Sequence, residues 1–209
     1  MIKAVLWDFG GVITTSPFEA FARYEREAGL PDGFIRGLNS TNADHNAWAK
    51  LERSQVDVAE FCRLYEDEAR TAGHEIDAQE VLACLAGDVR PEMVRALRRI
   101  RDHGLTQACL TNNFTPRERR PAIGPAGPIY EVFDHVIESS VVGVRKPDPE
   151  FYRIALDTVG IEPPEAVFLD DLGVNLKPAR ALGMTTIKVL DGQQALGELS
   201  DVLGIRLQA

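Results

Sequence analysis

The sequence contains only three cysteines, Cys62, Cys84 and Cys109, among its 209 residues. Their number is odd, and their spacing matches neither a C-x-x-C pair nor a cysteine metal site. This excludes a disulfide framework of the kind that stabilises small secreted domains. We therefore expect three reduced structural thiols in a cytoplasmic protein.

Long hydrophobic runs are also missing. No apolar segment approaches the roughly 18 residues that indicate a transmembrane helix. The first residues, Met1-Ile2-Lys3, lead directly into an apolar segment, without the charged region and cleavage site of a signal peptide. We therefore expect neither secretion nor insertion into a membrane.

Basic residues are too few to balance the acidic ones, because 23 Lys and Arg stand against 32 Asp and Glu, a net charge of −9. This balance argues against a nucleic-acid backbone and against an anionic membrane surface as partners. A small molecule that carries a phosphate group stays compatible with it, provided that its pocket is locally positive. The hydrophobic content of 44% and the charged content of 26% are ordinary for a soluble globular protein.

What the sequence does contain is a set of apolar runs that end in polar side chains suited to phosphate chemistry. They are Asp8 after residues 4–7, Thr111-Asn112 after residues 106–110, and Asp170-Asp171 after residues 166–169. A further segment, residues 143–148, supplies Lys146. Parallel sheets bind ligands at the carboxyl ends of their buried strands, so we expect these side chains to meet in one active site.

About 80 residues more than a βα crossover needs separate the first strand from the second, which begins near Thr106. Helix signals fill this interval: a helix from Pro17 to Ala28, and capping boxes that open helices at Asp57 and Asp77. We interpret residues 15–88 as an inserted helical cap domain over the active-site end of the sheet. Residues 1–14 and 89–209 then form the core domain.

Helices and strands alternate regularly after the insertion. The predicted helices cover residues 91–104, 149–159, 173–182 and 195–203, and the predicted strands cover residues 106–110, 136–137, 166–169 and 185–189. Residues 115–128 hold four prolines and two glycines, which predicts a loop. The fold class is therefore α/β, with a Rossmann-like parallel sheet flanked by helices.

Each strand-end group has a chemical and an ordinary interpretation. A carboxylate at Asp8 can attack phosphorus, although an aspartate there is by default a turn residue or helix cap. Asp170 and Asp171 make an oxygen-rich site of the kind that Mg²⁺ prefers, or an Asx turn that caps the next helix. Thr111-Asn112 can hold phosphate oxygens or form a polar turn. Lys146 can neutralise the aspartate and the phosphate, or be an exposed loop lysine.

Taken together, the order and strand-end positions of these residues resemble the haloacid dehalogenase-type hydrolase superfamily, whose members are mostly Mg²⁺-dependent phosphatases. The resemblance covers the whole chain and is densest from Tyr130 onward, in Phe133-Asp134, Val142-Gly143, Lys146-Pro147 and residues 167–180. That half is similar to the N-terminal phosphatase domain of the mammalian soluble epoxide hydrolases. Because these 209 residues contain no second hydrolase domain, we do not expect epoxide hydrolysis.

The resemblance implies a role for each site residue and implies Mg²⁺ as the cofactor. Asp8 would be the nucleophile and a metal ligand, joined at the metal by Gly10 and Asp171. The transferring phosphate of a small phosphate ester would be bound by Thr111, Asn112, Lys146 and the Gly10-Gly11 turn, with Lys146 also stabilising charge in catalysis. Asp170 and Asn175 would support the metal ligands, and the insertion would belong to the α-helical cap class.

Gly10 departs from the family pattern. Most phosphatases of this family carry a second aspartate at this position, as the general acid and base, whereas glycine has no side chain that can protonate a leaving alkoxide. General acid–base catalysis is worth about 10²–10⁴-fold. We therefore expect a preference for leaving groups that need little protonation, or an acid supplied by the cap, for which Asp44, His45 and Glu52 are candidates.

Two alternatives to a phosphatase stay open. A 2-haloacid dehalogenase would use Asp8 to attack carbon without a metal, but those enzymes usually carry tyrosine at the position of Gly10 and do not need Asp171. A catalytically weak binding or regulatory protein of the same fold is the other alternative, and Gly10 is its only support.

Overall fold

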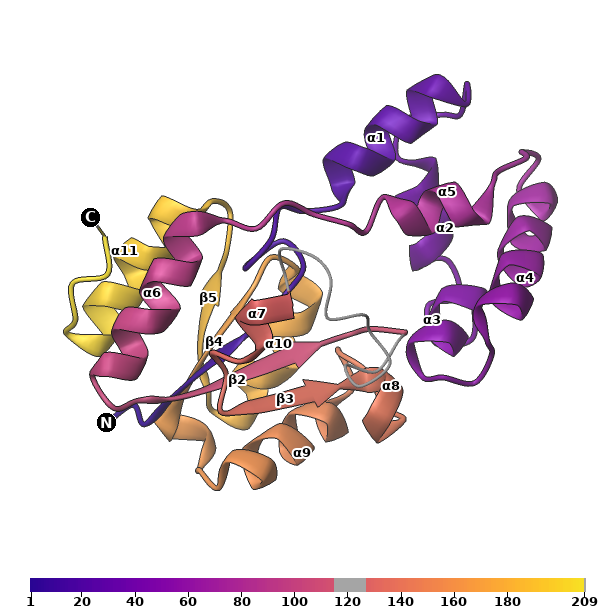
Figure 1. Ribbon diagram of the computed structural model, residues 1–209. Helices are drawn as coiled ribbons and strands as arrows, with labels where there is room; N and C mark the ends of the chain where they lie inside the picture. The colour runs from indigo at the N-terminus through magenta and orange to yellow at the C-terminus, as the bar shows by residue number, and fades with distance from the viewer. Residues whose placement is uncertain (115–126, 209) are drawn as a thin grey trace.

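Five parallel strands form one sheet in the order β3-β2-β1-β4-β5 (Figure 1). The structure is a computed structural model that describes residues 1–114 and 127–208. The strands are β1 (Ala4–Trp7), β2 (Thr106–Thr111), β3 (His135–Glu138), β4 (Ala166–Asp170) and β5 (Thr185–Lys188). The chain builds the sheet outward from β1 on one side and then returns to its other side with β4. Ligands bind where the strand order reverses, which here lies between β1 and β4.

Helices cover both faces of the sheet, as Figure 1 shows. Those on one face are α6 (Pro91–Asp102) and α11 (Gly192–Leu203), and those on the other are α9 (Pro149–Val159) and α10 (Gly173–Leu182). Successive side chains of a strand point to opposite faces, so Val5 and Trp7 join the first layer while Ala4 and Leu6 join the second. Both layers are apolar, which explains why the strands read as continuous hydrophobic runs. The predicted fold class is confirmed.

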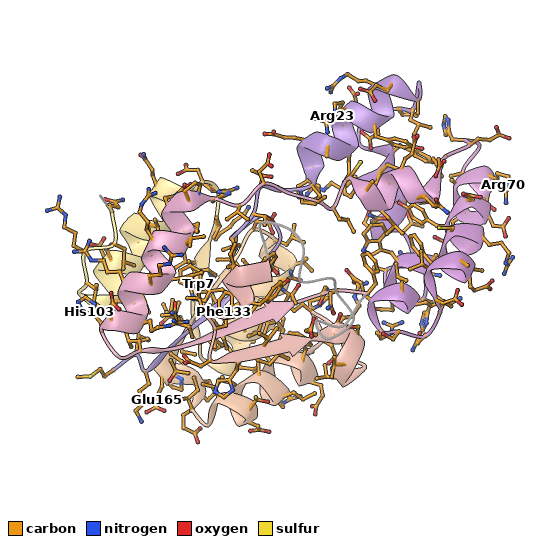
Figure 2. The ribbon with its side chains drawn as sticks, in the orientation of Figure 1. Trp7, Arg23, Arg70, His103, Phe133 and Glu165 are labelled. Atoms are coloured by element: carbon orange, nitrogen blue, oxygen red, sulfur yellow. The ribbon has the colours of Figure 1, made fainter. Side chains whose placement is uncertain are left out.

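Residues 18–83 form a separate group of helices beyond the carboxyl ends of the strands (Figure 1). They are α1 (Phe18–Glu27), α2 (Phe34–Ser40), α3 (Ala47–Glu52), α4 (Val58–Thr71) and α5 (Ala78–Ala83). Their own hydrophobic cluster contains the aromatic rings of Trp48, Phe61 and Tyr65, which contact one another. In Figure 2, Arg23 and Arg70 lie on this group, whereas Trp7 and Phe133 lie within the sheet region.

The two segments that connect these helices to the sheet region run side by side. Thr14 and Val89 form an isolated antiparallel bridge, and the amide of Thr15 donates to the carbonyl of Asp88 at 2.8 Å. A side chain at Gly87 would collide with the carbonyl of Thr15, which lies 2.7 Å from the position of its Cβ. The chain therefore enters and leaves the helical group through a narrow, double-stranded neck. No helix in the part of the chain that the structure describes is both long and apolar enough to cross a bilayer.

The structure differs from the sequence prediction in the short helices. Helices α2 and α3 are absent from the prediction, because α2 follows a left-handed glycine without a side-chain cap and α3 has only six residues. Two other short elements, α8 (Ser139–Val142) and the 3₁₀ turn at Pro163–Glu165, carry no periodic signal. Helix α7 (Gly127–Tyr130) begins inside the loop predicted over residues 115–128, since proline is tolerated in a first helical turn. Residues 115–126 of that loop lie outside the described residues.

Candidate active site

Asp8 lies immediately after β1, at the carboxyl edge of the sheet where the strand order reverses. Its amide donates to the carbonyl of Leu169 at 2.9 Å, which continues the pairing of β1 with β4. Its side-chain Oδ1 accepts a hydrogen bond from the amide of Phe9 at 2.7 Å. The residue is buried, with 8% of its surface exposed. Burial raises the pKa of Asp8, Lys146 opposes this increase, and the neighbouring carboxylates of Asp170 and Asp171 add to it.

Lys146 places a buried positive charge between two aspartates. Its Nζ lies 2.8 Å from Oδ1 of Asp8 and 2.8 Å from Oδ2 of Asp170, and only 1% of its side chain is exposed. Burial opposes the charged form, but the two carboxylates outweigh burial and hold the pKa of Lys146 above its ordinary value. Lys146 is therefore not the exposed loop lysine of the ordinary interpretation.

Asp170 is the best-bonded carboxylate in the cluster. Besides Lys146, it accepts hydrogen bonds from the amide of Leu172 at 2.8 Å and from Nδ2 of Asn175, which lies 3.1 and 3.0 Å from the two oxygens. Asp170 is fully buried, and Asn175 is buried beside it on α10. With both oxygens occupied, Asp170 is suited to orient Lys146 rather than to bind a ligand directly.

Asp171 points toward the turn that follows β1. Oδ2 of Asp171 accepts a long hydrogen bond of 3.4 Å from the hydroxyl of Ser16. A Cβ at Gly11, whose φ is +78°, would lie 2.2 Å from that same oxygen, so only glycine leaves room for this carboxylate. Burial and the neighbouring Asp170 raise the pKa of Asp171 to about 6.

The three aspartates lie close together, and two of them, Asp8 and Asp171, have carboxylate oxygens that are suited to a divalent cation. One oxygen from each of Asp8, Asp170 and Asp171 lies within 4.8 Å of the others. Among the described residues, no hydrogen bond from another residue reaches Oδ2 of Asp8 or Oδ1 of Asp171. Free carboxylate oxygens on neighbouring residues are the donors that Mg²⁺ prefers, and its remaining positions are usually filled by water and a substrate phosphate.

Gly10 leaves open space beside this cluster. A Cβ built at Gly10 would meet no heavy atom within 4 Å, in contrast to Gly11. The backbone at Gly10 is also outside the left-handed region, so its conformation does not require glycine. The missing aspartate is therefore not explained by a steric conflict.

The side chains of Thr111 and Asn112 have different surroundings at the end of β2. The hydroxyl of Thr111 is buried and lies at the 3.5 Å limit of a hydrogen bond to the carbonyl of Asn112. The side-chain carboxamide of Asn112 makes two hydrogen bonds to the backbone of Lys146. Its Oδ1 accepts from Lys146 N–H and its Nδ2 donates to Lys146 C=O, both at 2.9 Å. Thr111 therefore has a hydroxyl available for a phosphate, whereas the side chain of Asn112 fixes Lys146.

Of the candidate acids Asp44, His45 and Glu52, it is Glu52 that is hydrogen-bonded to the sheet region at this edge. Its Oε2 lies 2.6 Å from Nη1 of Arg145 and 3.4 Å from Nδ2 of Asn112, while Oε1 accepts from the indole of Trp48 at 3.1 Å. Burial raises the pKa of Glu52, and Arg145 and the Trp48 hydrogen bond oppose that increase. Asp44 and His45 are exposed.

Comparison with known proteins identifies the family of this site. The family model of haloacid dehalogenase-like hydrolases matches residues 2–183. The chain belongs to this family. It is 33% identical to acyl-CoA dehydrogenase family member 10 of Mus musculus over 98% of this chain and 19% of that protein. It is 30% identical to bifunctional epoxide hydrolase 2 of Sus scrofa over 99% of this chain and 40% of that protein, as the predicted resemblance requires.

The chain thus spans only a fifth to two fifths of those two relatives, but nearly all of a shorter one. It is 28% identical to sesquiterpene phosphatase astK of Aspergillus oryzae, over 97% of both chains. Solved structures under 25% identical share the fold. They include a haloacid dehalogenase-family enzyme from Bacteroides thetaiotaomicron in complex with magnesium and inorganic phosphate (TM-score 0.61, 19% identity, 90% of this chain and 94% of that one). Another is L-2-haloacid dehalogenase from Xanthobacter autotrophicus (TM-score 0.64, 21% identity, 99% and 84%).

Two residues of this hydrolase site are missing from the sequence prediction. Ser16 lies beyond the glycine turn and reaches Asp171, and Arg145 pairs with Glu52. Arg145 directly precedes Lys146, so its position in the motif segment is the only sequence signal that points to it. Ser16 has no such signal, because its contact joins residues 155 positions apart in the chain.

Proposed function

We propose that this haloacid dehalogenase-like hydrolase is a Mg²⁺-dependent phosphatase that acts on small phosphate esters through an aspartyl-phosphate at Asp8. The observation that carries the proposal is the position of the Lys146 ammonium, 2.8 Å from Asp8 and from Asp170, beside the further carboxylate of Asp171. A reaction at carbon without a metal has no use for a third carboxylate. The phosphatase relative that matches nearly the whole chain gives separate support.

In the proposed reaction, a carboxylate oxygen of Asp8 attacks phosphorus while the bond between phosphorus and the leaving oxygen breaks. Lys146 and Thr111 hold the phosphoryl oxygens, and Lys146 offsets the charge that develops on them. Water then attacks the phosphorus of the aspartyl-phosphate, releases inorganic phosphate and regenerates Asp8. The carboxylates of Asp8 and Asp171, with the carbonyl of Gly10, would hold Mg²⁺, which supplies positive charge to the phosphoryl oxygens.

Gly10 gives the first step its selectivity. Without a carboxyl group at this position, the leaving oxygen takes its proton from water, which disfavours alkoxides of high pKa. We propose that the preferred substrates carry acyl, aryl or sugar-anomeric phosphates, whose leaving groups need little protonation.

We also propose that residues 15–88 act as a cap domain on a core of residues 1–14 and 89–209. Support comes from the separate hydrophobic cluster of the five helices and from the paired segments at Thr14 and Val89. The cap would contact the leaving group, and it would therefore determine the substrate.

One assay with matched variants tests the proposal. Phosphate release from p-nitrophenyl phosphate and chloride release from a 2-chloro acid are each measured with Mg²⁺ and with EDTA. The proteins are the wild type, Asp8→Asn, and Asp157→Asn as a control at an exposed aspartate. We expect metal-dependent phosphate release that Asp8→Asn abolishes and that Asp157→Asn leaves unchanged.

The other outcomes identify the alternatives. Chloride release that EDTA does not affect would make the protein a dehalogenase, the activity named for one of its structural neighbours. No release under any condition would point to a binding or regulatory protein.

A further inference from the structure

Glu52 connects the helical cap to the segment that carries Lys146. It is the last residue of α3, and its carboxylate accepts hydrogen bonds or ion pairs from Trp48 in the cap and from Arg145 and Asn112 in the core. The side chains of Glu52 and Arg145 are 13% and 16% exposed, so water screens this ion pair only in part. A second contact connects the cap to this edge, because the hydroxyl of Ser54 donates to the carbonyl of Ser140 at 3.0 Å.

Both core partners of Glu52 bind the backbone of Lys146. The side chain of Asn112 makes two 2.9 Å hydrogen bonds to that peptide unit, and Nε of Arg145 donates to the carbonyl of Lys146 at 3.3 Å. The ammonium group at the other end of Lys146 lies between Asp8 and Asp170. Polar contacts from the cap therefore reach the backbone of Lys146, whose side chain in turn contacts the nucleophile.

We propose that Glu52 is a positioning residue that acts through Arg145 and Asn112 to hold Lys146 against Asp8. This inference rests on the proposed function, because it assigns Glu52 a task in that reaction. Without the carboxylate, the guanidinium of Arg145 would lose its counter-ion and would be less firmly held beside the carbonyl of Lys146. The side-chain carboxamide of Asn112 would lose the carboxylate oxygen that accepts its hydrogen bond. Both changes release the Lys146 segment.

The contacts of Glu52 distinguish this task from that of a proton donor. A protonated carboxyl group would present a hydrogen to one of three groups that are themselves donors, Trp48 Nε1, Arg145 Nη1 and Asn112 Nδ2. An ionised carboxylate accepts from all three. These three contacts favour the anion and oppose the effect of burial, so the geometry assigns Glu52 a positioning role rather than that of the acid missing at Gly10.

The experiment compares Glu52→Gln with Glu60→Gln, which removes a cap carboxylate whose ion pair, with Arg63, lies within α4. Phosphate release is measured with p-nitrophenyl phosphate and with phenyl phosphate, whose leaving group is more basic. Because small displacements of a charged group near the reacting atoms cost up to about a hundredfold, we expect Glu52→Gln to lower kcat by about tenfold to a hundredfold. We expect the same factor for both substrates and no change for Glu60→Gln.

Two further measurements separate positioning from general loss of structure. Arg145→Met combined with Glu52→Gln should lower kcat no more than Glu52→Gln alone, because the pair acts as a unit. Amide hydrogen exchange over residues 144–148, followed in protein without substrate, should be several times faster in Glu52→Gln than in the wild type or in Glu60→Gln, at equal melting temperature.

Each other result overturns the inference. Equal kcat and equal exchange in Glu52→Gln and Glu60→Gln would remove the positioning role. A loss that is larger for phenyl phosphate would make Glu52 a proton donor instead. If the wild type releases no phosphate, the proposed function fails, and the exchange measurement still decides whether Glu52 holds the Lys146 segment.

Discussion

Gly10→Asp offers a direct test of how the missing acid at position 10 affects the proposed phosphatase reaction. A Cβ at this position would meet no heavy atom within 4 Å, and the backbone there is outside the left-handed region. The Cβ of the new side chain therefore displaces no neighbouring atom. The new carboxyl group would stand near Asp8 and Asp171, whose negative charges would raise its pKa and favour its protonated form. A protonated carboxyl group is what a basic leaving group needs.

The expected gain depends on the leaving group. General acid catalysis is worth about 10²–10⁴-fold, which corresponds to about 3–5 kcal/mol of barrier. We expect an increase of this size in kcat for an alkyl phosphate, whose alkoxide must be protonated. For p-nitrophenyl phosphate the increase should be less than about tenfold, because nitrophenolate leaves without a proton. The assay is release of inorganic phosphate under saturating Mg²⁺.

Two control variants make the comparison specific. Gly10→Asn has the same shape but no acidic proton, so it should not accelerate alkyl phosphate hydrolysis. Gly11→Ala changes the adjacent glycine, where φ is +78° and a Cβ would lie 2.2 Å from Oδ2 of Asp171, so activity should fall with both substrates. Equal rates for Gly10→Asp and Gly10→Asn on the alkyl phosphate would refute the reasoning, since the missing acid would then not limit this reaction.

Two other predictions concern the charges of the cluster. Lys146→Met leaves two buried carboxylates without their cation and should lower the free energy of unfolding by about 3–5 kcal/mol in urea denaturation. Lys3→Met, which breaks an exposed pair with Glu165, should change it little, and a similar loss in both variants would contradict the prediction. In metal-free protein, the pKa of Asp171 is raised from 3.8 to about 6, so the folded state holds this proton more tightly than the unfolded chain does. The free energy of unfolding should therefore fall as the pH rises from about 4 to about 6. Mg²⁺ should raise the melting temperature more at pH 7.5 than at pH 4. An equal increase at both pH values would argue against these metal ligands.

Local signals in the sequence determined the elements of the core and the residues at the ends of its strands. Buried parallel strands must be apolar on both faces, so β1, β2 and β4 are visible as continuous hydrophobic runs. Helix ends depend on neighbours in the chain, as at Asp57 and Asp77, whose side chains cap α4 and α5. The meeting of Asp8 with Asp170 follows from these signals, because parallel strands bring their carboxyl ends to one edge.

Only the tertiary structure decided how the loops and the helices of residues 18–83 contact that edge. The sequence could not indicate that the side-chain carboxamide of Asn112 binds the backbone of Lys146, or that Glu52 pairs with Arg145. These contacts join residues 34 and 93 positions apart, and their geometry depends on packing between separate elements rather than on any repeating pattern. Strand-end chemistry is thus encoded locally, whereas the support that fixes Lys146 is a property of the folded chain.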